Sequence, residues 1–162
     1  MLGIRGALFD MDEVMFRAMT LGAHVRDSQG VEKMEGLDEL LEYLRDYMIP
    51  VAAVSSREKA QMEAVLEKAD LLHSFDVLLP KRRLDDTQQA ALVLAEGAEL
   101  LGVSPTRTLV CCADKDLANL AAGRRFVSVL VASDVDESTC AASAVVRTLD
   151  EAIDLLEAGS LR

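Results

Sequence analysis

Runs of continuous apolar residues alternate with amphipathic segments along almost the whole chain. In residues 37–48, apolar side chains recur every three or four positions, which is the spacing of one face of a helix. Several of the apolar runs end at aspartates or prolines, as expected of short buried strands. We therefore predict strands at residues 6–10, 51–56, 75–80, 108–114 and 126–132, an edge strand at 144–148, and helices at 37–48, 57–70, 88–102, 116–123 and 149–159.

This alternation predicts the fold class. Strands that are apolar throughout belong in a parallel sheet with helices on both faces, because such strands have no solvent-facing side. The expected architecture is α/β, a Rossmann-like three-layer αβα sandwich with a mostly parallel sheet. Asp85, Asp86 and Thr87 are candidate N-caps of the helix that ends near Gly102, a candidate C-cap. We find no repeat or linker, so residues 1–162 are predicted to form a single domain.

Composition and charge exclude several classes of protein. A hydrophobic content of 51% is too high for a disordered chain. The formal net charge of -11 opposes binding to nucleic acid, because that binding depends on cationic neutralisation of phosphates. We interpret the basic run Lys81–Arg83 as a solvated loop rather than a phosphate-binding patch. We therefore expect no nucleic-acid partner.

Cysteine usage and hydropathy indicate the compartment. Three cysteines, two of them adjacent at Cys111 and Cys112, do not make a disulfide framework and suit a reducing environment. No stretch approaches the roughly 20 apolar residues that a membrane-spanning helix requires. The first predicted strand begins too early to leave room for a signal peptide. These features predict a soluble cytoplasmic protein with no membrane partner.

Polar residues gather at the ends of the predicted strands. Ligands of parallel sheets bind beyond the carboxyl ends of the strands, so these residues are candidates for one shared site. For the two N-terminal aspartates, the alternative is a purely local role in capping the strand or forming a turn. The candidate site residues are Asp10, Asp12, Ser55, Ser56, Lys81, Asp114 and Asp116.

At three places the sequence resembles the haloacid dehalogenase (HAD) superfamily of phosphatases and phosphotransferases. The N-terminal "ALFDMDEVM" resembles the family's first motif, an apolar strand followed by Asp-x-Asp. Residues 36–80 are similar to the helix–strand–helix–strand region that carries the second motif. The stretch "LLGVSPTRTLVCCADKDLANLAAG" resembles the segment that leads into the fourth motif. The resemblance covers nearly the whole chain and implies a HAD-like fold.

The resemblance implies a role for each matched residue. Asp10 is the expected nucleophile, which forms an aspartyl-phosphate, and Asp12 is the expected acid and base. Ser55 is expected to donate a hydrogen bond to the phosphoryl group; the alternative is a small residue that fills a tight turn. A Mg²⁺ ion is also implied, because two carboxylates alone repel a phosphate. Its expected ligands are Asp10, Asp12, Asp114 and Asp116.

Three departures from the family pattern concern this same site. Glu13 stands where the family usually has glycine, and it adds a third carboxylate. Counting without gaps places Gln88 where the third motif has a lysine, and Lys81 is the candidate replacement as a phosphate-binding cation. In the fourth motif, two alignments remain open, with either Cys112 or Asp114 at the position of the first metal-binding aspartate. A thiol at that position suits Mg²⁺ poorly.

The chain has little room for the cap domain that many family members carry. Residues 16–35 are long enough only for a short flap, in which His24 is expected to be a surface residue. The stretch from Ser55 to Gln88 holds one predicted helix and one predicted strand. We therefore expect no substantial cap, and a site that is either open to large substrates or covered by a partner subunit in a homo- or hetero-oligomer.

Two hypotheses about function follow. The first is a Mg²⁺-dependent phosphatase that acts on a phosphorylated small molecule or a phosphoprotein. The second is a catalytically impaired protein of the same fold that serves as a binding or assembly subunit. A dehalogenase is less favoured, because that chemistry does not require the acid at Asp12. The fourth motif separates the first two hypotheses, since Asp114 at the metal position favours the enzyme and Cys112 favours the subunit.

Overall fold

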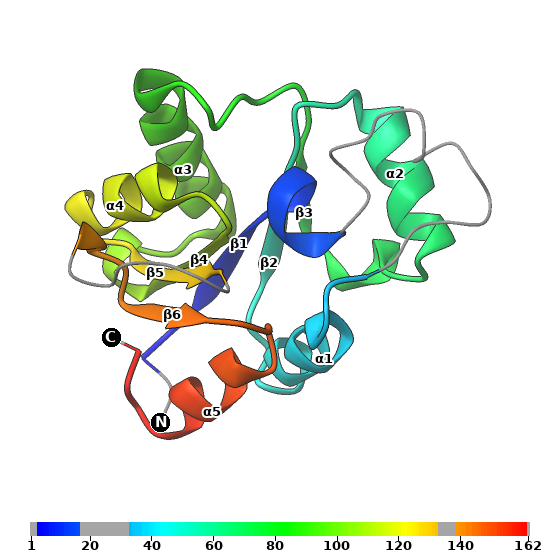
Figure 1. Ribbon diagram of the computed structural model, residues 1–162. Coiled ribbons are helices and arrows are strands. Elements are labelled where there is room, and N and C mark those ends of the chain that lie inside the picture. Colours follow the sequence, from blue (N-terminus) through cyan, green and yellow to red (C-terminus); the bar gives the residue numbers. More distant parts are fainter. Residues whose placement is uncertain (1–2, 17–32, 133–138, 162) are drawn as a thin grey trace.

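A parallel sheet forms the centre of the molecule (Figure 1). The computed structural model describes residues 3–16, 33–132 and 139–161. Within these ranges six strands lie in the order β3-β2-β1-β4-β5-β6, and every neighbouring pair is parallel. The N-terminal strand is therefore internal, with a neighbour on each side. The strands are β1 (Gly6–Asp10), β2 (Val51–Val54), β3 (Val77–Leu79), β4 (Thr108–Cys112), β5 (Val127–Val131) and β6 (Ala144–Val146).

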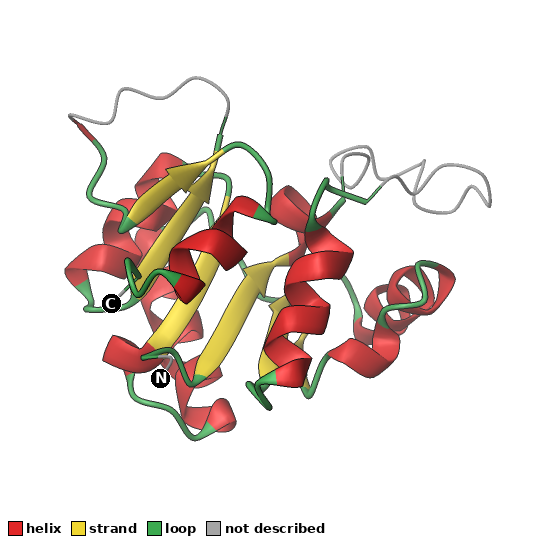
Figure 2. Ribbon diagram, turned by 90° about the horizontal axis from the view of Figure 1, so that it is seen from below, coloured by secondary structure: helices red, strands yellow, loops and turns green. Residues whose placement is uncertain are grey.

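Helices cover both faces of the sheet (Figure 2). Successive residues of a strand point to opposite faces, so β1 sends Leu8 to one face and Ala7 and Phe9 to the other. Leu8 packs in the core beneath α3 and α4, whereas Phe9 packs in the core beneath α1, α2 and α5. The predicted αβα sandwich is thus confirmed. The helices are α1 (Leu37–Asp46), α2 (Lys59–Lys68), α3 (Thr87–Leu101), α4 (Lys115–Gly123) and α5 (Glu151–Glu157).

The ends of α3 follow the predicted capping residues. Of the three N-cap candidates, Asp86 is the one that caps, and its carboxylate accepts hydrogen bonds from the amides of Gln88 and Gln89. At the other end Gly102 adopts a left-handed conformation, with φ of 71°, in which its amide bonds to the last turn of the helix. No helix in the described ranges is both long enough and apolar enough to cross a bilayer.

Some boundaries differ from the prediction. β2 ends at Val54, so Ser55 and Ser56 lie in the loop that follows it. A π-helical turn, η1 (Met11–Met15), follows β1 directly and was not predicted, because five residues are too few to show a helical period. Two short 3₁₀ turns, η3 (Leu72–Ser74) and η4 (Pro105–Arg107), precede β3 and β4.

Residues 16–35, which are predicted to form a short flap in place of a cap, are described only at their two ends. Phe16 and Lys33 form an isolated antiparallel bridge, and the amide of Met34 donates to the carbonyl of Met15 at 2.8 Å. Residues 17–32 lie outside the described residues, so the predicted flap and the surface position of His24 are untested.

Gly36 joins the start of α1 to the segment that leads into α5. Its φ is 86°, and a Cβ at this position would lie 2.2 Å from the backbone nitrogen of Asp150. The amide of Leu149 donates to the carbonyl of Glu35 at 2.9 Å, which brings the two segments together. This close backbone approach requires glycine for two separate reasons, conformation and space.

We predict that Gly36→Ala destabilises the protein more than Gly102→Ala. Both positions have a left-handed backbone, which costs a residue with a Cβ about 1–2 kcal/mol, but a Cβ at Gly102 meets nothing within 4 Å. The clash with Asp150 should add about 1–3 kcal/mol at Gly36. Urea denaturation of both variants measures the difference, and equal losses would contradict the close contact.

Candidate active site at the carboxyl ends of the strands

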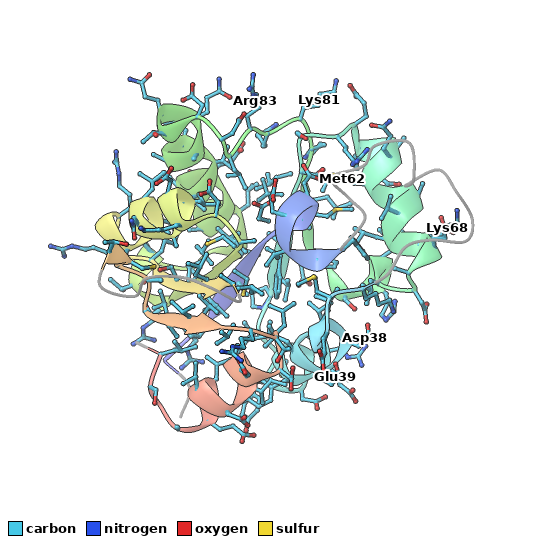
Figure 3. All side chains as sticks on the ribbon, in the orientation of Figure 1. Asp38, Glu39, Met62, Lys68, Lys81 and Arg83 are labelled. Carbon is cyan, nitrogen blue, oxygen red and sulfur yellow. The ribbon has the colours of Figure 1, made fainter. Side chains whose placement is uncertain are left out.

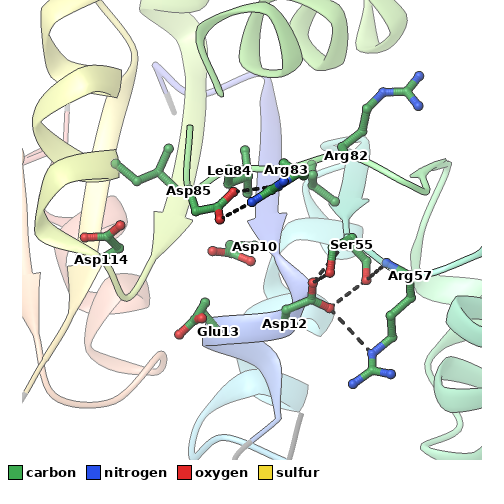
Figure 4. Close-up of a pocket in the computed structure, with 13 residues that line it drawn as sticks. Asp10, Asp12, Glu13, Ser55, Arg57, Arg82, Arg83, Leu84, Asp85 and Asp114 are labelled. Carbon is green, nitrogen blue, oxygen red and sulfur yellow. Dashed lines mark hydrogen bonds and ion pairs between the residues drawn. The ribbon is translucent and has the colours of Figure 1, made fainter. Parts of the chain in front are cut away.

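A pocket of about 780 Å³ opens at the carboxyl end of the sheet (Figure 4). Residues at or just after the ends of β1, β2, β3 and β4 line it, as expected for a ligand site of a parallel sheet. The lining contains carboxylates, hydroxyls and guanidinium groups. Its residues are Asp10, Asp12, Glu13, Val54, Ser55, Ser56, Arg57, Arg82, Arg83, Leu84, Asp85, Asp114 and Leu117.

Asp10, the last residue of β1, is the most deeply buried carboxylate of the lining, with 7% of its surface exposed. The pKa of Asp10 is raised from its ordinary value of 3.8 to about 7. Burial is the largest cause, and the negative charges of Asp12 and Glu13 act in the same direction. The backbone amides of Asp12 and Glu13 oppose the shift by hydrogen bonding to the carboxylate. The ionised form of Asp10 therefore lacks adequate compensation from the protein alone.

The π-helical turn η1 positions the second acid. Met11, Val14 and Met15 of this turn are fully buried and hold it against the core. With these three side chains directed inward, Asp12 and Glu13 are left to line the pocket beside Asp10. Single π turns often occur at functional sites, and here the turn brings two more carboxylates to the end of the same strand.

Asp12 is held by the loop that follows β2 (Figure 4). Ser55 Oγ donates to Asp12 Oδ1 at 2.6 Å, and both the amide and the hydroxyl of Ser56 donate to Oδ2, at 2.9 and 2.8 Å. Arg57 Nε lies 3.9 Å from Oδ1. Both carboxylate oxygens thus have defined partners, which sets the orientation of the acid.

This loop is itself tied to the loop that follows β3. The amide of Arg82 donates to the carbonyl of Ser55 at 2.9 Å, and the amide of Lys81 donates to the carbonyl of Arg57 at 2.8 Å. The amide of Ser55 donates to the carbonyl of Leu79 at 3.1 Å, which continues the pairing of β2 with β3. The two loops therefore form one connected wall of the pocket.

Two arginines of this wall differ in how firmly their ion pairs hold them. Arg82 makes a two-pronged ion pair with Glu96 of α3, at 2.8 and 2.9 Å, and also donates to the carbonyl of Pro80. In Figure 4 its guanidinium extends away from Asp10. Arg83 pairs with Asp85 at 2.8 and 3.1 Å, and both of these side chains are largely exposed. Exposed pairs contribute little stability, so Arg83 is the arginine that a bound anion can recruit at small cost.

Lys81 does not line the pocket, which corrects its predicted place as the phosphate-binding cation. Its ammonium lies 3.0 Å from Glu58, at the start of α2, and its side chain is 63% exposed. Figure 3 shows Lys81 nearer to α2 and Arg83 nearer to α3, although both belong to one basic run. Gln88 is also exposed and outside the lining, because its place is the first turn of α3.

Of the two residues that the open alignments of the fourth motif place at the metal position, Asp114 lines the pocket and Cys112 does not. Asp114 lines the pocket and caps α4, accepting a hydrogen bond from the amide of Asp116 at 3.0 Å. Asp116 itself is exposed and is not part of the lining. Cys112 is fully buried under α3 and α4, and burial raises the pKa of its thiol well above the ordinary value. A buried neutral thiol is not a metal ligand, so Asp114 is the residue that remains for that position.

The residues present suit a Mg²⁺ ion shared with a phosphate. Asp10 and Asp114 both offer hard carboxylate oxygens to the pocket. Among the described residues no group of three or more His, Cys, Asp or Glu side chains is arranged to hold a metal. Mg²⁺ commonly binds through one or two carboxylates together with waters and substrate phosphate oxygens, rather than in an all-protein cage. Of the four aspartates predicted to hold Mg²⁺, Asp10, Asp12 and Asp114 line the pocket and Asp116 does not, and the carboxylate of Asp12 accepts hydrogen bonds from two serines.

The sequence reasoning missed the guanidinium groups of the pocket. Arg57 follows the two serines, and the run Lys81–Arg83 was interpreted as a solvated loop, yet Arg82 and Arg83 line the site. The available signal was the position of these residues directly after predicted strands. The spacing did not indicate which of three consecutive basic residues faces inward.

Comparisons with known proteins agree with this geometry. A family model described as haloacid dehalogenase-like hydrolase matches residues 10–125. No curated protein matches the chain.

Three solved structures illustrate the similarity of fold. A HAD phosphatase from Thermococcus onnurineus is 18% identical, with a TM-score of 0.74 over 94% of this chain and 98% of that one. The L-2-haloacid dehalogenase from Xanthobacter autotrophicus is 15% identical, with a TM-score of 0.72 over 96% and 99%. A β-phosphoglucomutase from Clostridium difficile is 12% identical, with a TM-score of 0.75 over 97% of each chain. At these identities the likeness concerns the fold alone.

We predict that Asp10→Asn stabilises the metal-free protein at alkaline pH. Because the folded-state pKa of Asp10 is raised, folding favours its protonated form, and stability falls as the pH rises from about 4 to about 7. A difference of one between the folded and unfolded pKa values corresponds to about 1.4 kcal/mol. The ionised carboxylate of Asp10 therefore lowers the free energy of unfolding by up to about 4 kcal/mol. Asparagine removes this cost while keeping the shape of the side chain.

Urea denaturation in the presence of a chelator, at about pH 5 and about pH 8, measures the effect. The difference in free energy of unfolding between the variant and the parent protein should become more favourable to the variant as the pH rises from about 5 to about 8. Parallel pH profiles would show that Asp10 does not carry the shifted pKa.

Proposed function

Because the chain belongs to the haloacid dehalogenase-like hydrolases, we propose that it is a phosphatase that hydrolyses phosphate monoesters through an aspartyl-phosphate on Asp10. One observation carries the proposal: Asp10 is buried at the floor of a pocket, with a second acid, Asp12, oriented beside it by three hydrogen bonds. The similar solved structures include both a phosphatase and a dehalogenase, so the choice between these reactions rests on the side chains of the site. A dehalogenase is not favoured, because that reaction gives no role to Asp12.

In the first step, a carboxylate oxygen of Asp10 attacks phosphorus and the bond from phosphorus to the ester oxygen breaks. Asp12 gives its proton to the departing ester oxygen, so that the alcohol leaves neutral. The backbone amides of Asp12 and Glu13 donate hydrogen bonds to the carboxylate of Asp10. Amides at this position can also stabilise the negative charge that develops on the phosphoryl group.

In the second step, a water molecule attacks phosphorus of the aspartyl-phosphate. Asp12, now a carboxylate, takes one proton from that water, and the bond from phosphorus to Asp10 breaks. Orthophosphate leaves, Asp10 is again a carboxylate, and Asp12 is again protonated. The net reaction consumes one phosphate monoester and one water.

The charge of the pocket calls for a cation. Among the described residues, five carboxylates and three guanidinium groups line it, a formal excess of two negative charges that opposes a phosphate dianion. Asp10 and Asp114 are the residues that would hold Mg²⁺, which when bound supplies neutralising charge for both the carboxylates and the substrate.

Arg83 takes the place of the lysine that the third motif lacks. It comes from the loop after β3, lines the pocket, and forms an ion pair with the exposed carboxylate of Asp85. A guanidinium matches two oxygens of a phosphate at once. We assign to Arg83 the binding of the phosphoryl oxygens as charge develops on them.

The substrate is a phosphorylated small molecule or a phosphoprotein, and a partner subunit in a homo- or hetero-oligomer is a further candidate to cover the pocket. Between Ser55 and Gln88 the chain forms only α2, η3 and β3, so this stretch contributes no cap domain. All three cysteines are unpaired, and Cys111 and Cys112 lie in the core. The unpaired cysteines support a protein of the reducing cytoplasm, and the formal net charge of -11 argues against a nucleic-acid partner.

A second candidate function is that of a catalytically impaired subunit of an assembly. The observation in its favour is that no lysine is among the pocket's lining residues and Arg82 is occupied by Glu96. Against it, Asp114 rather than Cys112 faces the pocket. The two functions differ in whether the purified chain turns over a phosphate ester.

We predict Mg²⁺-dependent hydrolysis of an aryl phosphate that falls by roughly three orders of magnitude or more in Asp10→Asn. Mg²⁺ should also raise the thermal midpoint of the parent protein, because a ligand that binds only the folded state stabilises it. The same addition should have little effect on the Asp10→Asn variant. Turnover equal in both proteins, or absent from both, would favour the assembly subunit.

We also predict that Arg83→Gln lowers kcat/KM for the aryl phosphate by roughly 100-fold to 1000-fold, the usual cost of losing one donor to the transition state. Lys81→Gln is the matched control from the same basic run. Because its partner Glu58 is exposed and outside the pocket, it should change kcat/KM by less than about threefold. The reverse order of effects would return the role to Lys81.

A further inference from the structure

The hydroxyl of Ser55 points at an acid rather than at the substrate. A serine has one hydroxyl proton, and that of Ser55 goes to Asp12 Oδ1 at 2.6 Å, while its oxygen accepts the amide of Arg57 at 3.1 Å. Ser55 is also 1% exposed, although it lines the pocket. In this arrangement its hydrogen-bonding capacity is used within the protein.

Ser56 strengthens the same arrangement from the next position. Its amide and its hydroxyl both donate to the other oxygen of Asp12, Oδ2. Three donors from two consecutive residues therefore orient one carboxyl group, and the loop that carries them is fixed to the β3 loop by backbone hydrogen bonds. Such a connected support restricts the directions in which Asp12 can present a proton.

We propose that the Ser55–Ser56 turn is a positioning device for Asp12, and that its effect on catalysis is confined to esters whose alcohol must be protonated as it departs. The inference rests on the proposed function. An aliphatic alkoxide is a poor leaving group and must be protonated as it departs, whereas a dinitrophenolate leaves without help. An acid held by three hydrogen bonds matters for the first class of ester and not for the second.

Ser56 gives the sharper variant, because it is exposed and its side chain reaches only Asp12 among the described contacts. We expect Ser56→Ala to lower kcat/KM for glycerol phosphate by roughly 10-fold to 100-fold, as misplaced catalytic groups do. For dinitrophenyl phosphate the change should be less than about threefold. The ratio kcat/KM is the proper quantity, because it excludes the later hydrolysis of the aspartyl-phosphate, in which Asp12 also takes part.

Two further variants separate positioning from loss of fold. Ser56→Thr keeps the hydroxyl and the amide, so it should restore activity toward glycerol phosphate to within about threefold. Ser104→Ala is the matched control, since Ser104 is an exposed serine next to Thr106, in the loop before η4. It should leave both substrates unaffected. Thermal midpoints of all variants establish that each is folded.

The outcomes decide the matter. An equal loss on both esters in Ser56→Ala would overturn the inference, because Ser56 would then act on the phosphoryl group or on the fold. The inference would also be overturned if Ser56→Ala left kcat/KM unchanged for both esters while Asp12→Asn lowered kcat/KM for glycerol phosphate alone. If the parent protein hydrolysed neither ester faster than Asp10→Asn does, the proposed function itself would be overturned, and the inference with it.

Discussion

The parallel pairing of β1 with both β2 and β4 is the constraint on which the site depends. In this register Asp10 lies beside Val54 of β2, and Phe9 lies beside Cys111 of β4. The three strands therefore end at nearly the same level, and the loops that follow them begin around Asp10. Neighbouring strands are only about 4.8 Å apart, which brings side chains from distant parts of the sequence within reach of one carboxylate. A slip of one residue would turn Asp10 to the opposite face of the sheet.

The position of Asp10 works against the stability of the metal-free fold. A carboxylate that is nearly buried and has two acidic neighbours resists ionisation, which is why its pKa rises to about 7. A structural residue would gain nothing from this arrangement. A nucleophile at the end of a rigid strand gains a fixed position with little access to water. The counter-ion that accompanies a bound phosphate would lower the free-energy cost of ionising it. The electrostatic cost is thus itself a sign of function.

Under the proposed function, residues from other places in the fold compensate for the departures from the family pattern. Glu13 adds a negative charge, and the expected lysine position holds an exposed Gln88. The β3 loop supplies guanidinium groups instead, with Arg82 anchored to Glu96 and Arg83 left at the pocket. An anchored arginine next to a recruitable one gives the loop both rigidity and a cation that can bind phosphate.

The sequence by itself determined the α/β class, the order of the elements and the capping glycine Gly102, and it singled out Asp10 and Asp12 as candidate site residues and Asp86 as one of three candidate N-caps of α3. These follow from local patterns, because apolar runs, helical spacing, caps and a paired carboxylate motif are all read within a few neighbouring residues. Only the tertiary structure showed that Asp114 rather than Cys112 lines the pocket, that Arg83 rather than Lys81 does so, and that Ser55 donates to Asp12. Each depends on the direction of a side chain in a loop, and that direction is set by contacts between strands far apart in the sequence, which no local spacing records.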